Sequence, residues 1–124
     1  IKRLVDDLCF PVNIISAPIH RESDGLAMSS RNWHITDDER PKVIILKQSL
    51  DWIVERIQSG NLDFFELENE AKARIKKQGF DVDYITCCNS ENLDSAANDD
   101  KKITVLGAMY TKKARLIDNV SITF

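Results

Sequence analysis

The sequence predicts an α+β protein, in which the closing helix and strand of an α/β domain precede a small domain of two helices and a three-stranded antiparallel sheet. Three observations lead to this expectation. Apolar residues recur at the spacing of an amphipathic helix in two consecutive segments between residues 36 and 78. After residue 80, apolar residues alternate with polar ones or run together in three segments of strand length. Residues 1–15 show a helical pattern followed at once by a buried-strand pattern, which is typical of the second half of a βαβ unit.

The first helix and strand are expected within residues 1–15. Residues 1–9 place their apolar side chains on one helical face, as at the end of an amphipathic helix. The apolar run from Val12 to Ile15 lies between Pro11 and Pro18 and has the length of a buried strand. The first half of the βαβ unit is absent, and the chain does not open with methionine. We therefore expect a piece of a larger protein, cut inside an α/β domain.

Two amphipathic helices are predicted next. Thr36 and Glu39 have the Thr-x-x-Glu spacing of a capping box, which marks the start of the first helix. Pro41 has no N–H to donate, so the helix is expected to begin effectively at this proline. It should end at Ser59-Gly60. The second helix is expected from about Asp63 to Gln78, where a glycine follows it.

Three strands are predicted in the last third of the chain. Residues 80–88 largely alternate in polarity, residues 103–110 form an apolar run, and residues 114–124 return with apolar side chains. Thr111-Lys112-Lys113 has the composition of a turn between the last two strands. Strands joined by so short a turn are expected to pair antiparallel.

Composition and charge exclude several classes of partner. Hydrophobic residues make up 43% and charged residues 30% of the chain, with a net charge of −3. The basic residues form no stripe, which argues against a nucleic-acid partner, and no apolar run approaches the roughly 18 residues of a membrane span. The three cysteines match no disulfide framework or zinc spacing, which indicates a cytoplasmic setting. One of the adjacent Cys87 and Cys88 is expected to face the core and the other to face away.

The segment of residues 18–34 has no regular period and is expected to be a loop. It is rich in Ser, Asp and Gly, with Asp24-Gly25 as a turn signal. Long ordered loops in compact domains are usually functional. The hydroxyls of Ser29 and Ser30 and the guanidinium of Arg31 could all donate to phosphate oxygens. From spacing alone, a phosphate clamp and an ordinary solvated loop both remain open.

The loop sequence also carries a resemblance. PIHRESDGLAMSSRN resembles the second nucleotide-binding loop of the pantothenate synthetases, in which Asp-Gly-Leu-Ala-Met/Leu-Ser-Ser-Arg-Asn is the family motif. Farther along, Asp38-Glu39-Arg40, Gly79-Phe80 and the segment ARLIDN at residues 114–119 are similar to the family in the expected order. The resemblance implies an ATP-dependent, AMP-forming ligase that condenses pantoate with β-alanine through a pantoyl adenylate.

The resemblance further implies a division of the chain and a set of partners. Residues 1–17 would be the remnant of a Rossmann-like nucleotide-binding domain, residues 18–34 the ATP-binding loop, and residues 35–124 the C-terminal α+β domain. The partners would be ATP, pantoate and β-alanine, the chain's own N-terminal domain, and a second full-length copy in a homodimer. Most of the active site would lie in the missing half, so the chain alone is expected to be inactive.

Five residues receive roles from the resemblance. Arg31, Ser29 and Ser30 would be catalytic, by neutralising charge on the α-phosphate and the departing pyrophosphate. Met28 would contact ATP beside them, and His20 would lie against the adenine through its backbone. Mg²⁺ is expected to accompany ATP, but no metal ligand can be assigned in this chain.

Four further charged residues are interpreted as structural. Arg21 and Asp24 could shape the loop by a local ion pair, and Arg115 and Asp118 are expected to fix the last strand or a domain contact. Two alternative functions remain open. One is the C-terminal part of another nucleotidyltransferase, and the other is a non-catalytic binding module.

Overall fold

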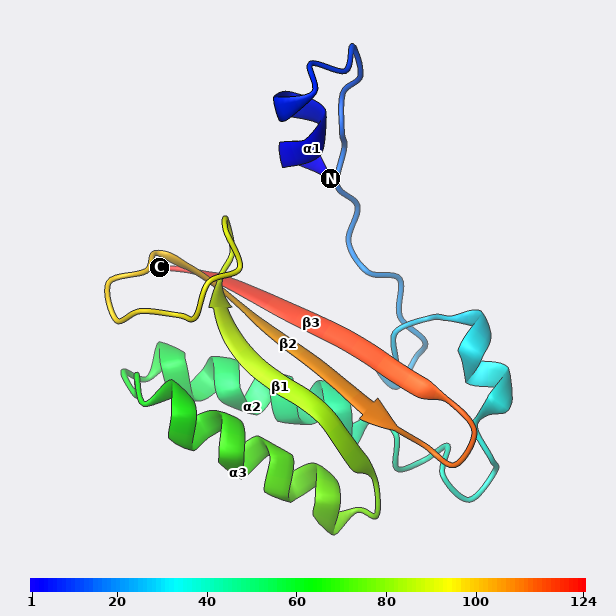
Figure 1. The fold of residues 1–124 in the computed structure, drawn as a ribbon. Helices are drawn as coiled ribbons and strands as arrows, with labels where there is room; N and C mark the ends of the chain where they lie inside the picture. The colour runs from blue at the N-terminus through cyan, green and yellow to red at the C-terminus, as the bar shows by residue number, and fades with distance from the viewer.

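Two helices pack on one face of a three-stranded antiparallel sheet in the computed structural model, which describes all of residues 1–124 (Figure 1). The strands lie in the order β1-β2-β3, so β2 is central. The predicted two helices and three-stranded antiparallel sheet are confirmed. The elements in chain order are α1 (Lys2–Asp7), the 3₁₀ helix η1 (Ser30–His34), α2 (Ile45–Gln58), α3 (Phe64–Lys77), β1 (Asp81–Asn89), β2 (Lys102–Tyr110) and β3 (Arg115–Thr123).

The core lies between the two helices and the sheet. Apolar side chains recur every three or four residues on the inner faces of both helices, and at alternate positions on the strands they cover. Gly107, at the centre of β2, lets α2 approach closely. A Cβ at this position would lie 2.9 Å from Ile85 Cδ1 and 3.0 Å from the nearest methyl groups of Leu46 and Leu50. The buried core residues of α2 and α3 are Leu46, Leu50, Ile53, Val54, Ile57, Leu67, Ala71 and Ile75.

The helix α2 begins at Ile45, four residues after the predicted start at Pro41. The capping-box prediction is wrong in its detail, because the Thr36 hydroxyl donates to the Glu39 carboxylate at 2.9 Å and does not accept from the Glu39 N–H. The other oxygen of Glu39 accepts from the backbone N–H of Lys112 at 3.1 Å. Glu39 is therefore drawn to the β2–β3 turn, and the preceding residues form turns instead of regular helix.

The helix α3 has the predicted bounds, with Asp63 as its N-cap and Gln78 as its C-cap. The Asp63 carboxylate accepts from the Glu66 N–H at 3.1 Å, which satisfies one of the unpaired donors of the first turn. Gly79 follows with a φ of +93°, a conformation that stops a helix and suits glycine.

Replacing Asp63 with alanine is expected to lower the free energy of unfolding by about 1 kcal/mol, since the cap loses its acceptor. Denaturant unfolding followed by circular dichroism measures the change. Asp63→Asn keeps an acceptor oxygen and should lose little. An equal loss in both variants would show that the hydrogen bond is not the source of the stability.

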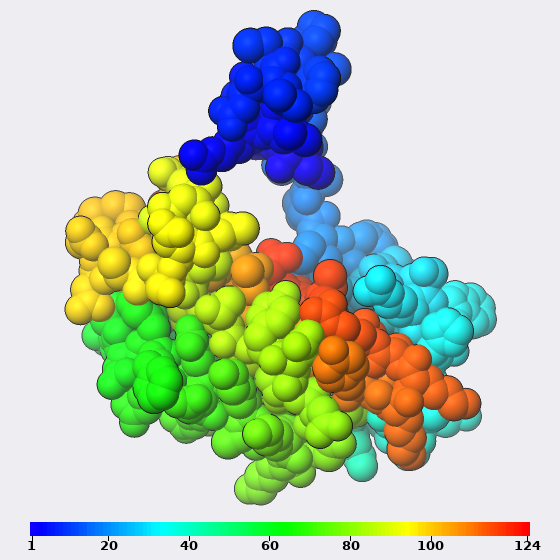
Figure 2. All heavy atoms as spheres, viewed as in Figure 1, coloured from blue at the N-terminus to red at the C-terminus, as the bar shows by residue number.

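The N-terminal segment stands away from the rest of the molecule (Figures 1 and 2). The predicted helix is present as α1, but none of its residues is buried. The predicted strand is wrong for this structure: Val12 is 56% and Ile15 is 89% exposed, and the segment has no strand partner. A strand needs a neighbouring strand to satisfy its backbone N–H and C=O groups, and no strand runs beside this segment. No helix of the structure combines the length and apolar character that a membrane span would need.

The three cysteines are free, and they differ in exposure. Cys87 belongs to the core between sheet and helices. Cys88, expected to face away, does lie outside this core cluster but is also buried, with its thiol 3.3 Å from the carbonyl oxygen of Thr104. Burial raises the pKa of Cys87 to about 12 and raises the pKa of Cys88 as well.

Native alkylation at pH 8 is therefore expected to modify Cys9 rapidly and the other two cysteines only after unfolding. Cys9 is exposed, whereas the two strand thiols stay protonated because their pKa values are raised, and the thiolate is the reactive form. Mass spectrometry of the iodoacetamide-treated chain counts the modified thiols. Rapid modification of two or three thiols in the native protein would contradict the burial of Cys87 and Cys88.

Candidate functional site

The first half of the loop is a small hairpin. The N–H of Met28 donates to the carbonyl of His20 at 2.9 Å, and the N–H of Glu22 donates to the carbonyl of Leu26 at 2.8 Å. Gly25 occupies the tip with a φ of +97°, which confirms the predicted turn. The side chain of Leu26 enters the hydrophobic core, so the hairpin is anchored to the body by an apolar contact.

The second half of the loop is the 3₁₀ helix η1. Ser29 is its N-cap, and its hydroxyl oxygen accepts from the Arg31 N–H at 3.2 Å. The side-chain amide of Asn32 donates to the carbonyl of Ala27 at 3.1 Å, which ties the helix back to the hairpin. The hairpin is therefore followed directly by Ser29, Ser30 and Arg31. The backbone of this segment is held by the Met28–His20 bond before it and by the Asn32–Ala27 bond after it.

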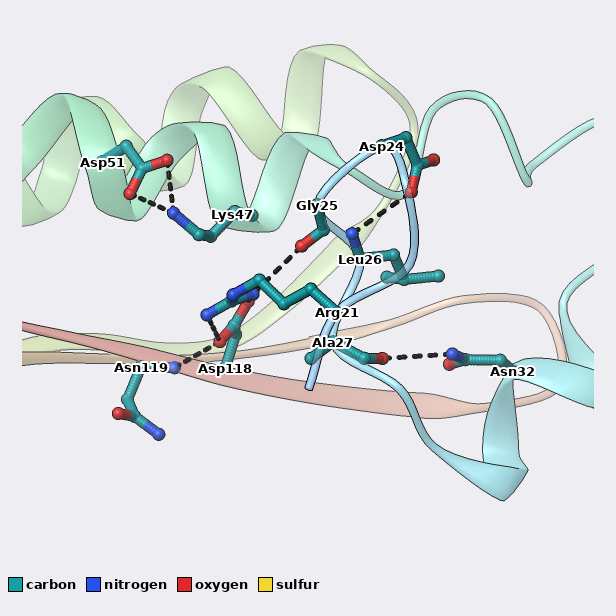
Figure 3. A network of polar contacts seen from close by, with 10 residues as sticks. All are labelled: Arg21, Asp24, Gly25, Leu26, Ala27, Asn32, Lys47, Asp51, Asp118 and Asn119. Atoms are coloured by element: carbon teal, nitrogen blue, oxygen red, sulfur yellow. Dashed lines mark hydrogen bonds and ion pairs between the residues drawn. The ribbon is translucent and has the colours of Figure 1, made fainter. Parts of the chain in front are cut away.

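An ion pair joins the hairpin to strand β3. The two terminal nitrogens of Arg21 donate to the two carboxylate oxygens of Asp118, at 2.7 and 2.9 Å (Figure 3). One of these nitrogens also donates to the carbonyl of Gly25 at 3.0 Å. The side chain of Asp118 is only 4% exposed. Asp118 thus fixes a contact of the strand, as expected, but its partner lies 97 residues away, and no sequence signal identifies such a pair.

The expected Arg21–Asp24 pair does not form. Asp24 pairs with Arg40 at 2.6 Å, and Arg40 also bonds Glu22. The Arg40 guanidinium holds the pKa of Asp24 below its ordinary value. A lowered pKa means that this stabilisation is present above the ordinary Asp value of about 4 and is lost as the pH falls. Both side chains are about one-third exposed, so the contribution is small.

The loop and strand β3 enclose a hollow of about 330 Å³. A second hollow, of about 670 Å³, lies beside the same loop residues. Met28 and Ser29 line both, Arg31 lines the first, and Ser30 lines the second. His20 lines neither, although its carbonyl is hydrogen-bonded to Met28. Four of the five sequence-predicted site residues therefore line one or both hollows, with Ser30 and Arg31 in different ones, and all five are exposed.

Arg31 differs from the other cations around the first hollow. Lys47 pairs with Asp51, and Arg115 pairs with Asp83 at 2.7 Å. Arg31 has no carboxylate partner, and its guanidinium makes no hydrogen bond within the chain. An unpaired guanidinium that follows two serines in the chain is suited to a phosphate group, because guanidinium and hydroxyl groups donate to anionic oxygens.

The structure brings together no group of three or more His, Cys, Asp or Glu side chains that could hold a metal ion.

Comparison with known proteins gives a consistent result. A family model described as pantoate-beta-alanine ligase matches residues 1–121. The pantothenate synthetases of Cellvibrio japonicus and Saccharophagus degradans are each 57% identical, over 98% and 99% of this chain and 43% of their own length. The crystal structure of pantothenate synthetase from Thermus thermophilus superposes with a TM-score of 0.87 at 31% identity, over 96% of this chain and 43% of that one.

A more distant structural relative is the pantoate-beta-alanine ligase of Francisella tularensis, solved in complex with β-γ ATP and β-alanine. It gives a TM-score of 0.56 at 28% identity, over 96% of this chain and 37% of that one. The chain spans less than half the length of the relatives it matches.

Proposed function

The chain belongs to the pantoate–β-alanine ligase family, and from this premise we propose that it is the C-terminal part of an ATP-dependent, AMP-forming ligase. The proposed reaction condenses pantoate with β-alanine to give pantothenate. The names of the relatives support this activity, and the bound molecules of the Francisella tularensis enzyme support ATP and β-alanine as substrates. Because the chain spans 43% of the length of its curated relatives, we assign the remaining part of the site to a preceding domain of the same protein.

One observation carries the proposal for the loop. Arg31 is the cation at the first hollow that has no carboxylate partner, and it follows two exposed serines, which are the N-cap and the first residue of η1. In the proposed reaction a carboxylate oxygen of pantoate attacks the α-phosphorus, and the bond to the departing pyrophosphate breaks. Arg31, Ser29 and Ser30 donate to the phosphate oxygens on which negative charge grows, which stabilises the transition state.

In the second step of the proposed reaction, the residues of this chain only hold the nucleotide. The amine of β-alanine attacks the acyl carbon of the pantoyl adenylate, the bond to AMP breaks, and the amine loses a proton. Met28 and His20 hold the nucleotide during both steps. The N–H of Met28 is already bonded to the His20 carbonyl, so Met28 offers its carbonyl and side chain, and His20 offers its unpaired N–H. Mg²⁺ would neutralise phosphate charge when bound with ATP, and none of the proposed roles in this chain depends on it.

The proposed division of the chain follows the same assignment. Residues 1–17 close the Rossmann-like domain, residues 18–34 form the ATP-binding loop, and residues 35–124 form the C-terminal domain. The exposed apolar side chains of residues 1–15 support a covering domain, since Leu4, Phe10 and Val12 are each half exposed or more. The full-length protein is proposed to work in the cytoplasm as a homodimer.

An assay of AMP release by the full-length protein tests the proposed activity. Release is expected to require ATP, pantoate and β-alanine together, and the 124-residue chain alone is expected to show no measurable turnover. Release that depends on nicotinate mononucleotide instead of pantoate would favour another nucleotidyltransferase. A folded full-length protein that turns over neither substrate would favour a non-catalytic module.

A further inference from the structure

We propose that Arg21 and Asp118 are positioning residues, which set where the phosphate-binding loop stands relative to the sheet. Neither residue is assigned to touch ATP. The inference rests on the proposed function of the loop, and it concerns how that loop is kept in its active position.

The pair is well built for this task. Both terminal nitrogens of Arg21 bond Asp118, at 2.7 and 2.9 Å, so the planar guanidinium is fixed in orientation as well as in distance. Asp118 accepts a further hydrogen bond from the Asn119 N–H at 2.8 Å, which holds the carboxylate against strand β3 (Figure 3). The Arg21 side chain is 22% exposed and that of Asp118 is 4% exposed, so solvent screens the pair little.

Hydrogen bonds and the short stretches of backbone between them connect this pair to Arg31. Arg21 bonds the carbonyl of Gly25 at the hairpin tip, and the hairpin bond between Met28 and His20 follows at the other end. Ser29 is the next residue, and its hydroxyl accepts from the Arg31 N–H. A displacement of Arg21 is therefore expected to shift the backbone that carries the three phosphate-binding residues.

Two other contacts, the buried Leu26 side chain and the Arg40 ion pairs, also hold the loop, but they restrict its position less than the Arg21–Asp118 pair does. Leu26 is buried in the core, which keeps the hairpin attached to the body. Apolar contacts are not directional, so this anchor tolerates a rotation of the hairpin. The Arg40 pairs are about one-third exposed and contribute less. Loss of the Arg21–Asp118 pair should therefore leave the protein folded and the loop misplaced.

The test compares Asp118→Asn with Asp100→Asn in the full-length protein. Asp100 is the matched control, because the substitution is the same and Asp100 also accepts two hydrogen bonds, from the Asn89 side chain and from the Ala97 N–H, but it lines neither hollow and bonds no residue of the loop. Hydrogen exchange reports the order of the loop, and steady-state kinetics with varied ATP reports catalysis. Arg21→Lys serves as the conservative variant that keeps a charge but loses the two-nitrogen contact.

Asp118→Asn is expected to speed exchange of the Glu22 and Met28 amides by about tenfold or more, with the amides of β2 unchanged. It should lower kcat by about 10- to 100-fold and change KM for ATP less than about threefold. The reason is that displaced loop donors lose mainly the hydrogen bonds that they make to phosphate in the transition state. Arg21→Lys should fall between Asp118→Asn and the wild type, and Asp100→Asn should match the wild type in both measurements.

Several results would overturn the inference. Unchanged loop exchange in Asp118→Asn would show that the pair does not order the hairpin, and equal acceleration in β2 would show a general loss of stability. Faster loop exchange with an unchanged kcat would show that loop position does not matter. Arg31→Ala tests the phosphate role of the loop separately from the positioning role of Arg21 and Asp118. Full activity of that variant would refute the proposed function of the loop and the positioning role with it.

Discussion

Replacing Arg31 with alanine is expected to lower kcat of the full-length protein by about 10²- to 10³-fold, which corresponds to about 3–4 kcal/mol of transition-state stabilisation. The guanidinium has no partner within the chain, so its removal breaks no contact that stabilises the fold. The loss should therefore appear in the reaction and not in the melting temperature. Pyrophosphate release with saturating ATP and pantoate measures the first step directly.

Two control variants make the result specific. Arg31→Lys keeps the charge but cannot bind a phosphate through two parallel N–H groups, and it should recover only part of the activity. Arg56→Ala removes an arginine near the end of α2, beside Trp52 and away from the loop, and should leave kcat unchanged. An Arg31→Ala enzyme with kcat within about threefold of the wild type would refute the phosphate role, because removing even one preorganised donor typically costs more than this.

Replacing Leu50 with alanine is expected to lower the free energy of unfolding by about 3–4 kcal/mol, the largest change in stability predicted for this chain. Leu50 is fully buried, and one of its methyl groups would lie 3.0 Å from a Cβ at Gly107. Truncation removes apolar contacts and leaves a cavity between α2 and the centre of the sheet. Thermal unfolding should show a fall in Tm of roughly 10 °C. Leu4→Ala, at a position that is 54% exposed, is the matched control and should change little.

Coupling between Leu50 and Gly107 tests the packing more sharply. Gly107→Ala alone should destabilise by about 1–2 kcal/mol, since the new Cβ would crowd Ile85, Leu46 and Leu50. In the Leu50→Ala background the added methyl group enters space that has been vacated, so the double variant should lose less than the sum of the two changes. Strict additivity would show that α2 does not approach β2 at this point as closely as described.

The loop shows where sequence reasoning reaches its limit. The turn at Asp24-Gly25 is a local property of the chain, and the composition of the loop predicts it. The gathering of Ser29, Ser30 and Arg31 beside one another follows from their adjacency. The contact that holds these residues in place cannot be read from the sequence, because Arg21 is equally compatible with a local partner such as Asp24. Its choice of Asp118 depends on β3 passing beside the hairpin.

The sequence alone determined the three α-helices, the three strands of the sheet and the loop that carries the motif, because periodicity, caps and turn residues act over a few neighbouring positions. The tertiary structure decided what depends on distant partners. Glu39 left the predicted cap because the backbone N–H of Lys112, 73 residues away, donates a hydrogen bond to its carboxylate. Residues 12–15 formed no strand, because a strand requires another strand beside it and none lies there. Asp118 became the anchor of the loop because folding brought Arg21 to it from 97 residues away, where a buried carboxylate requires a charged partner.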